Sequence, residues 1–357
     1  MSNRTILITG AAGFVGHHMV EHFLKNTQDN VIGVDCLNYS GTWDRLRDIQ
    51  LDVTNGEPDP KFPHRYVSAY DHPRFTPLTY DFRQPAEPNL LRELREVTHV
   101  LHMGAESHVD SSITDPMKFT ISNVLGTVNM LNLARQLPNL LLFIYFSTDE
   151  VFGPAPFEMK GGYSEKDRHD PKNPYAASKS AAEQMVNSFA NTYNLPCIIT
   201  RQMNIFGERQ HPEKFIPICI KRSLTGELVQ IHATPDKTQA GVRAYIHARN
   251  IADAHLFLLK SRPWTNTPVR EVASYHIVGE QEVDNLTLAK TIAQILGKEL
   301  NYEMVDFHSR RPGHDLRYAL CGNKMKGLGW TPPKTFHQSL KTTIDWTLSN
   351  KNWIGLD

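Results

Sequence analysis

Short, continuous apolar runs alternate with helix-like stretches along the first half of the chain. Such runs are typical of parallel strands covered on both faces; they lie at 6–9, 31–35, 99–103 and 141–146. Helical patterns lie between them, notably over 15–26 and 123–136. Residues 52–80 lack clear periodicity and predict an inserted surface segment. This order of elements predicts an α/β fold built on a doubly wound parallel sheet.

The second half of the chain is less regular and predicts a smaller lobe. Its best defined element is a helix over 175–193, introduced by Asn173-Pro174. Further strand-like and helix-like stretches lie at 197–201, 243–259 and 275–278. We therefore expect two interleaved domains, one formed by 1–203 plus about 242–279, the other by about 204–241 plus 280–357.

Composition narrows the class of protein. The 38 Lys and Arg residues balance the 38 Asp and Glu residues, so neither a nucleic-acid-binding nor a membrane surface is expected. The four cysteines lie far apart and show no Cys-x-x-Cys spacing. We therefore expect no disulfide framework and no cysteine metal site. No apolar run has transmembrane length, and a strand-like run from Thr5 leaves no room for a signal peptide. A cytoplasmic globular protein is expected.

A glycine-rich segment follows the first apolar run and opens the first helical pattern. Gly10, Gly13 and Gly16 are spaced Gly-x-x-Gly-x-x-Gly. Small residues let the backbone approach a pyrophosphate, and a helix N-terminus supplies free N–H groups. Asp35 ends the second run, where its carboxylate can accept both hydroxyls of an adenosine ribose. Because it would repel a 2′-phosphate and no Arg follows it immediately, NAD is favoured over NADP.

Candidate chemistry lies after the fourth apolar run. Thr148, Asp149 and Glu150 follow a predicted central strand, although acids at such a place often only cap a turn. Tyr175 and Lys179 are four apart and share one helix face. A phenol has a pKa of about 10, and a neighbouring ammonium and a bound nicotinamide cation would lower it. Together with the glycine segment, these residues predict oxidation of a secondary alcohol by NAD.

The chain resembles the extended short-chain dehydrogenase/reductase family, and within it the nucleotide-sugar 4,6-dehydratases of the dTDP-glucose type. The resemblance covers nearly the whole chain. It rests on the motifs Thr9–Gly16, Ala105–Asp110, Ser147–Gly153, Asn173–Lys179, Arg201–Gly207, Pro212–Pro217 and Arg311–Asp315. The Asp149-Glu150 pair is the discriminating element, since epimerases of this family usually lack both acids and the related decarboxylases usually keep only the glutamate.

The resemblance implies a Rossmann fold and a role for each catalytic residue. Tyr175 would take the proton of the sugar O4, Thr148 would hydrogen-bond near O4, and Lys179 would hold the nicotinamide ribose. Glu150 would remove the C5 proton, and Asp149 would protonate the departing C6 hydroxyl. The product would be a 4-keto-6-deoxy nucleotide sugar, and a homodimer built through the helix of Tyr175 and a neighbour is the usual family state.

Binding residues carry over by position. The resemblance implies a cofactor site formed by Gly10, Gly13, Phe14, Val15, Gly16, Asp35, Asp81, Phe82, Ala105, Tyr175 and Lys179. It implies a nucleoside-diphosphate hexose site formed by Glu106, Ser107, Asn204, Lys214, Arg243, Gln281 and Arg311. His17, His18 and His22 are interpreted as helix-surface or packing residues.

Departures from the family pattern leave the substrate open. They touch the lobe that reads nucleotide and sugar, and they are found at Met203, Ile205, Thr234–Gly241, Ala248–Asn250 and Glu280-Gln281. The nucleotide and the hexose are therefore not fixed by the sequence. Two alternatives to a 4,6-dehydratase stay open: a nucleotide-sugar 4-epimerase or decarboxylase, and an NAD-binding scaffold protein without turnover.

Overall fold

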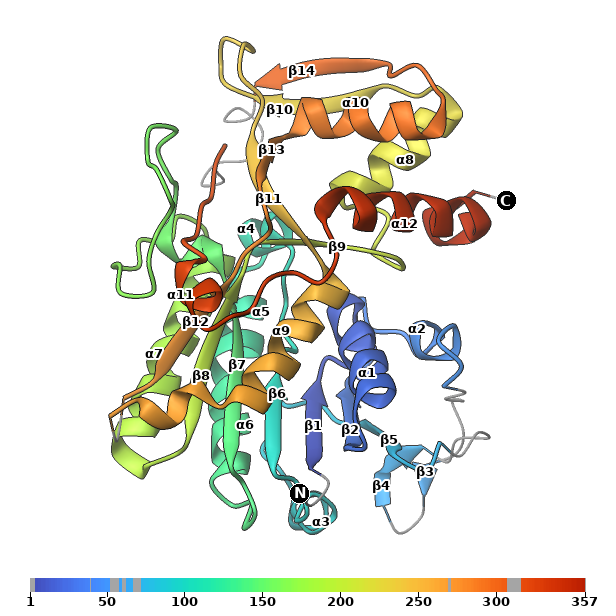
Figure 1. Ribbon diagram of the computed structural model, residues 1–357. Coiled ribbons are helices and arrows are strands. Elements are labelled where there is room, and N and C mark those ends of the chain that lie inside the picture. Colours follow the sequence, from blue (N-terminus) through green and yellow to red (C-terminus); the bar gives the residue numbers. More distant parts are fainter. Residues whose placement is uncertain are drawn as a thin grey trace. The chain divides into compact units, whose positions relative to one another are not determined.

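A nine-stranded sheet organises the first part of the protein (Figure 1). The computed structural model describes residues 4–38, 40–51, 58–59, 62–66, 72–268, 271–306 and 316–356, and no side chains between 52 and 71. In sheet order the strands are β12 (Ala273–Ile277), β8 (Cys197–Gln202), β7 (Leu142–Thr148), β6 (His99–His102), β1 (Thr5–Thr9), β2 (Asn30–Asp35), β5 (Phe75–Thr79), β4 (Phe62–Tyr66) and β3 (Pro58–Asp59). The first seven in that order form a parallel sheet, which confirms the predicted fold class.

The strand order reverses its direction at β1. This strand pairs in parallel with β2 on one side and with β6 on the other, so the chain changes direction across the sheet there. Open α/β sheets bind ligands at the carboxyl ends of strands flanking such a switch point. Gly10 follows β1 and Gly104 lies two residues after β6, so both glycines lie at the carboxyl ends of the strands that flank the switch point.

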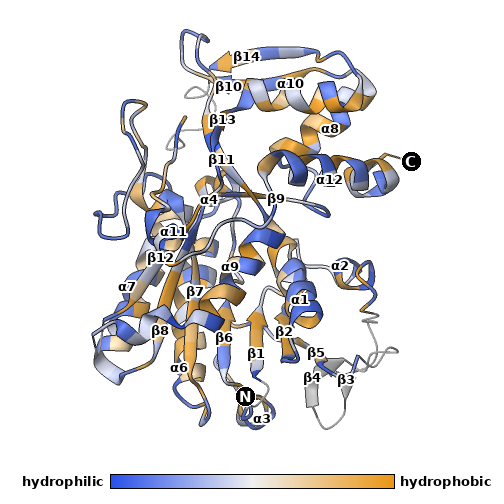
Figure 2. Ribbon diagram, viewed as in Figure 1, coloured by the Kyte–Doolittle hydropathy of each residue, from blue (hydrophilic) through white to orange (hydrophobic). Residues whose placement is uncertain are grey.

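Helices connect these strands. Those of the sheet-bearing part are α1 (Phe14–Asn26), α2 (Asp44–Arg47), α3 (Pro88–Glu93), α4 (Val109–Thr114), α5 (Pro116–Phe119), the π-helix η1 (Thr120–Leu125), α6 (Gly126–Ala134), α7 (Pro174–Tyr193) and the 3-10 helix η3 (Pro263–Asn266). One apolar cluster joins the sheet to α3, α6 and α7. Figure 2 shows apolar residues concentrated in strands such as β1 and β8. The predicted α1 and α7 are confirmed within one residue.

Two compact units emerge from the contacts within the chain. The first comprises Met1–Thr148, Pro174–Arg201 and His255–Tyr275; the second comprises Asp149–Asn173, Gln202–Ala254 and His276–Asp357. The strands of the second unit are β9 (Asn204–Phe206), β10 (Val229–Ala233), β11 (Val242–His247), β13 (Glu282–Asp284) and β14 (Tyr302–Asp306). Its helices are η2 (Asp149–Phe152), α8 (Phe215–Thr225), α10 (Asn285–Leu296), α11 (Asn323–Gly327), α12 (Phe336–Ser349) and η4 (Lys351–Ile354), while α9 (Ala248–Ser261) runs from this unit into the first.

The predicted surface segment at 52–80 is wrong at its end. Residues Phe75–Thr79 form β5, which pairs in parallel with β2 inside the sheet. Pro77 made this strand hard to recognise, because proline lacks the N–H that a strand ladder uses. Strands β3 and β4 continue the sheet as its edge.

The histidines of α1 differ in their burial. His17 and His18 are completely buried with ring centroids 4.0 Å apart, so both are packing residues. His22 on the same helix is only half-buried.

Within the described ranges, no helix is long and apolar enough to cross a membrane.

Candidate active site

The glycine segment is built for a close backbone approach. Gly10 has a φ of 72°, and a Cβ there would lie 2.9 Å from the Cα of Gly104. A Cβ at Gly16 would overlap the carbonyl of Gly10, so the loop packs directly on the helix that it opens. Gly13 is the N-cap residue of α1, a helix of 13 residues whose first backbone N–H groups have no partner within the helix. This cradle fits a dinucleotide pyrophosphate.

Asp35 is fastened to the same loop. Its two carboxylate oxygens accept hydrogen bonds from the Ala12 N–H at 3.0 Å and the Leu37 N–H at 2.8 Å. Burial raises the pKa of this carboxyl, and the backbone donors oppose the rise. Each oxygen keeps a further lone pair for a ribose hydroxyl. The position fits the predicted ribose ligand.

Asp81 and Phe82, the predicted adenine contacts, follow β5. Arg83 pairs with Asp81 at 2.5 Å, and this hydrogen bond is the main reason why the pKa of Asp81 is lowered. Phe82 is buried, with its ring against Gly104 and Gly126 and edge-on to His102, 5.1 Å between centroids. Phe82 therefore packs against the residues that follow β6, while Asp81 stays half-exposed.

Ala105, Glu106 and Ser107 form an extended segment after β6. The side chain of Asn123 holds this segment: its Oδ1 accepts from the Glu106 N–H at 2.9 Å and its Nδ2 donates to the Glu106 carbonyl at 3.0 Å. The same Nδ2 donates to Ser178 Oγ at 2.9 Å. Asn123 therefore ties the segment to the helix of Tyr175 and Lys179. Our sequence reasoning missed it, since no pattern marks the π-helical turn η1 in which it lies.

Tyr175 and Lys179 lie in the first turns of α7. Lys179 is buried, donates from Nζ to the Phe146 carbonyl at 2.6 Å and lies 4.4 Å from the centroid of the Tyr145 ring. Burial lowers the pKa of Lys179 to about 7, and the nearby carboxylate of Glu183 opposes the fall. Tyr175 is half-buried, edge-on to Phe119. The amine is thus fixed near the C-terminal end of strand β7. There it can orient a ribose and lower the pKa of a neighbouring phenol.

Replacing Lys179 by Met removes a buried amine whose pKa falls from 10.5 to about 7 on folding. Below pH 7 the wild type bears the full cost of burying an ammonium, and this cost disappears as pH rises towards 10.5. The variant's gain in free energy of unfolding is therefore largest at and below pH 7 and shrinks by about 1.4 kcal/mol per pH unit between pH 7 and pH 10.5. Urea unfolding of both proteins at several pH values measures this. Lys25→Met, which changes an exposed lysine, serves as the control, and a gain that is independent of pH would contradict the account.

Asp149 and Glu150 lie on η2, the 3-10 helix that directly follows Thr148 at the end of β7. Asp149 is buried, whereas Glu150 is half-buried and accepts a hydrogen bond from Asn173 Nδ2 at 3.0 Å. Phe152 anchors the turn by stacking on Tyr163, 5.3 Å between ring centroids. The two carboxyls therefore sit in different surroundings, as a pair with separate acid and base roles requires.

Several predicted substrate residues lie on the small sheet of the second unit, ordered β13-β11-β9. Asn204 begins β9 and pairs with Tyr245 of β11, and exposed Gln281 directly precedes β13. Arg243 of β11 is buried and donates to the carbonyls of Val242 and Leu316 at 2.8 and 2.7 Å. Much of its hydrogen-bonding capacity therefore serves the protein's own backbone.

The remaining predicted contacts lie apart from this sheet. Lys214 caps the N-terminus of α8, with its Nζ 3.9 Å from Glu213. Arg311 lies outside the described residues. The sequence reasoning overlooked Arg317, which is buried and binds Glu282 through two hydrogen bonds of 2.9 Å. In the described part of the chain, no group of three or more His, Cys, Asp or Glu residues could hold a metal ion.

Comparison with known proteins identifies the family of this chain. The model of the NAD dependent epimerase/dehydratase family matches residues 6–267. The dTDP-glucose 4,6-dehydratase of Salmonella typhimurium is 33% identical, covering 98% of this chain and 94% of its own. The dTDP-glucose 4,6-dehydratase of Neisseria gonorrhoeae is 32% identical, covering 98% and 96%.

Solved structures of the same fold include a dehydratase and an epimerase. DesIV, a dTDP-glucose 4,6-dehydratase from Streptomyces venezuelae with NAD and TYD bound, has a TM-score of 0.81 at 31% identity and covers 98% of this chain and 99% of its own. The UDP-glucuronic acid 4-epimerase of Bacillus cereus reaches a TM-score of 0.80 at 21% identity, over 97% and 99%, and shares the fold. The chain belongs to the NAD dependent epimerase/dehydratase family, as its sequence motifs indicated.

Proposed function

We propose that this protein is an NAD-dependent nucleotide-sugar 4,6-dehydratase, a hydro-lyase that converts a nucleoside-diphosphate hexose to its 4-keto-6-deoxy derivative for deoxysugar biosynthesis. The observation that carries the proposal is the pair of adjacent acids, Asp149 and Glu150, directly after the strand that ends in Thr148. Tyr175 and Lys179 supply the base for alcohol oxidation that the same reaction requires. The two relatives from Salmonella typhimurium and Neisseria gonorrhoeae, which match 98% of this chain, are both named dTDP-glucose 4,6-dehydratase.

The first step is oxidation at C4. Tyr175 removes the O4 proton as a phenolate, and Thr148 donates a hydrogen bond near O4. Lys179, fixed on the Phe146 carbonyl, holds the nicotinamide ribose and stabilises the phenolate when it is charged. The glycine cradle and Asp35 would hold NAD, which when bound would supply a hydride acceptor for C4 and a hydride donor for C6.

The second step is loss of water between C5 and C6. The 4-keto group acidifies the C5 hydrogen, and Glu150 removes this proton as the base. Asp149 protonates the C6 hydroxyl as it departs. When a hydride is added at C6, Glu150 gives a proton back to C5 and the saturated 4-keto-6-deoxy sugar results. Asn173 donates a hydrogen bond to Glu150 and so holds this carboxylate in place. The acid pair thus explains why an ordinary alcohol dehydrogenase site becomes a dehydratase.

A panel of nucleotide sugars tests the proposal. Purified protein is incubated separately with dTDP-glucose, UDP-glucose, GDP-mannose, CDP-glucose and UDP-N-acetylglucosamine, and each product is weighed by mass spectrometry. Loss of one water from a donor supports the dehydratase and identifies its nucleotide. Isomerisation without a change in mass would favour a 4-epimerase. A donor panel left wholly unchanged while NAD binds would favour the scaffold alternative.

The division of labour between the units is part of the proposal. The first unit contains the glycine segment, Asp35 and the Tyr175–Lys179 helix, so it holds NAD. The second unit contains Asn204, Lys214 and Arg243, so it reads the nucleotide diphosphate and the hexose. The four cysteines are free thiols, which suits a reducing compartment, and we place the protein in the cytoplasm.

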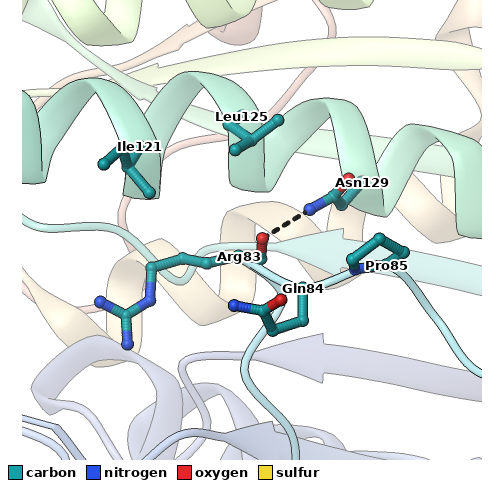
Figure 3. A pocket seen from close by; sticks show the side chains of 6 residues that line it. All are labelled: Arg83, Gln84, Pro85, Ile121, Leu125 and Asn129. Atoms are coloured by element: carbon teal, nitrogen blue, oxygen red, sulfur yellow. Dashed lines mark hydrogen bonds between the residues drawn. The ribbon is translucent and has the colours of Figure 1, made fainter.

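A homodimer is supported by an apolar row on the first unit. Ile113, Met117, Ile121 and Leu125 follow one another at intervals of four residues along α4, α5 and η1, with exposed fractions between 39 and 63%. Exposed apolar patches of this kind mark interaction surfaces. The row borders a cavity of about 610 Å³ lined by Ile121, Leu125, Arg83, Gln84, Pro85 and Asn129 (Figure 3).

The neighbouring helix can complete the interface. α7 contacts α4, α5 and η1, and its exposed side carries the small residues Ala177 and Ala181. Small residues allow a second pair of helices to approach closely, so the apolar row and α7 suit a four-helix contact with another copy of the chain.

Introducing charge into the apolar row dissociates the dimer. Ile121→Glu combined with Leu125→Glu places two carboxylates on an apolar contact, which is costly to bury. Sedimentation velocity is expected to report a dimer for the wild type and a monomer for this variant. Leu141→Glu changes an exposed leucine away from the row and leaves the dimer intact. A monomeric wild type, or a dimer that survives the double change, would rule out this surface.

A further inference from the structure

A buried charge cluster lies where β9 ends and α9 begins, outside the proposed catalytic residues. Glu208 is almost completely buried, and its carboxylate accepts a hydrogen bond from His247 Nε2 at 3.0 Å. Arg249 pairs with the other carboxylate oxygen. Glu208 follows β9, whereas His247 ends β11 and Arg249 lies in the first turn of α9. The cluster therefore joins three elements of the second unit.

Hydrogen bonding fixes the protonation of the cluster. The Arg249 backbone N–H lies 3.0 Å from His247 Nδ1, and because an amide N–H only donates, Nδ1 is the acceptor. The proton of the neutral ring is then on Nε2 and is donated to Glu208. Burial lowers the pKa of His247, against the opposing effect of Glu208, so the ring is neutral. One carboxylate and one guanidinium remain, and their charges cancel.

The chain between β9 and α8 is fastened at successive residues. After Glu208, Arg209 has a φ of 63° and its guanidinium carbon lies 4.7 Å from the Trp346 ring of α12. Gln210 Nε2 then donates to the Ile205 carbonyl at 2.9 Å. Three consecutive side chains thus bind four elements, β11, α9, α12 and β9. This connection, 207–214, begins three residues after Asn204 and ends at Lys214.

We propose that Glu208, His247 and Arg249 form a positioning cluster that holds the 207–214 connection so that Asn204 and Lys214 meet the nucleotide diphosphate. The proposal rests on the function proposed above. A buried ion pair adds little net stability compared with apolar residues, but its directional hydrogen bonds favour one conformation. None of the three side chains is assigned contact with the substrate, so the cluster acts through the residues that it places.

Glu208→Gln tests the proposal, because it keeps the size of the side chain and removes the charge that binds Arg249. The Kd is measured for whichever of dTDP, UDP, GDP and CDP the wild type binds. We expect this Kd, and the KM for the matching nucleotide sugar, to rise about tenfold, because a fold-change of this size corresponds to the loss of one charge-assisted hydrogen bond. The value of kcat stays within about twofold, since the catalytic groups are untouched. Titration calorimetry gives the Kd, and initial rates give KM and kcat.

Matched variants separate positioning from general destabilisation. Arg249→Lys keeps the charge at a partly exposed side chain and is expected to weaken nucleotide binding less than Glu208→Gln. Asp345→Asn breaks an exposed ion pair with Lys341 in the same unit and leaves Kd, KM and kcat unchanged. Unchanged nucleotide binding in Glu208→Gln, or a fall in kcat at constant KM, would overturn the cluster's role.

The calorimetric comparison also keeps the two proposals distinguishable. A wild type that binds a nucleoside diphosphate without dehydrating any sugar would reject the proposed function, while the Kd values of the variants would still decide the role of the cluster. A wild type that binds none of the four diphosphates would reject both.

Discussion

Glu150→Gln is expected to abolish dehydration while leaving oxidation at C4 in place. Glutamine keeps the size of the side chain but cannot take the C5 proton, so the 4-keto sugar forms and loses no water. General base catalysis contributes about 10²–10⁴ in rate, and we expect turnover to fall by about a thousandfold. Deuterium uptake at C5 in D₂O, followed by NMR, reports this step directly: the wild type exchanges C5 and the variant does not.

The neighbouring acid provides the sharpest comparison. Asp149→Asn removes the acid for the C6 hydroxyl but leaves Glu150, so C5 exchange continues while water loss stops. Glu158→Gln changes an exposed carboxyl a few residues along the chain and leaves both activities unchanged. C5 exchange at the wild-type rate in Glu150→Gln would mean that another group is the base, and full 4-epimerisation by this variant would favour the epimerase alternative.

Tyr175→Phe is expected to stop the reaction before the keto group forms. Phenylalanine keeps the ring against Phe119 but cannot remove the O4 proton, so neither C4 oxidation nor C5 exchange follows. We expect kcat to fall by about 10³–10⁴-fold, which is near the upper end of the rate contribution of a general acid or base. Initial rates of water loss, measured by mass spectrometry, give the size of the effect.

The control for this change lies on the same helix. Tyr193→Phe removes the exposed hydroxyl at the far end of α7 and leaves kcat unaltered. The binding of NAD to Tyr175→Phe should stay within a few-fold of wild type, since the glycine cradle and Asp35 are intact. Residual turnover within tenfold of wild type would show that Tyr175 is not the base for O4.

Features with a local signal could be predicted from the sequence. Continuous apolar runs identified β1, β2, β6 and β7, because a strand buried on both faces needs apolar residues at every position. The spacing of Gly10, Gly13 and Gly16 predicted a close backbone approach, and a Cβ at Gly10 or Gly16 would meet backbone atoms at less than 3.0 Å. The roles of Asp35 and of the Tyr175–Lys179 pair were predicted in the same way, from a fixed place in one element, and they stay predictions.

Features that depend on distant residues could not be predicted. The Glu208–His247 bond joins residues 39 apart in the sequence, and no local pattern announces it. Lys179 was expected to face the cofactor ribose, but its hydrogen bond to the Phe146 carbonyl depends on how α7 packs on β7. Arg243 was expected to bind phosphate, and only the structure reveals that it also binds two backbone carbonyls.

The product formed by the wild-type protein in D₂O tests the central claim most directly. With the nucleotide sugar that the protein accepts, the account predicts a product that has lost one water and gained one deuterium at C5, since Glu150 exchanges that proton with solvent. A product of unchanged heavy-atom composition with inverted C4, or water loss without deuterium at C5, would contradict it.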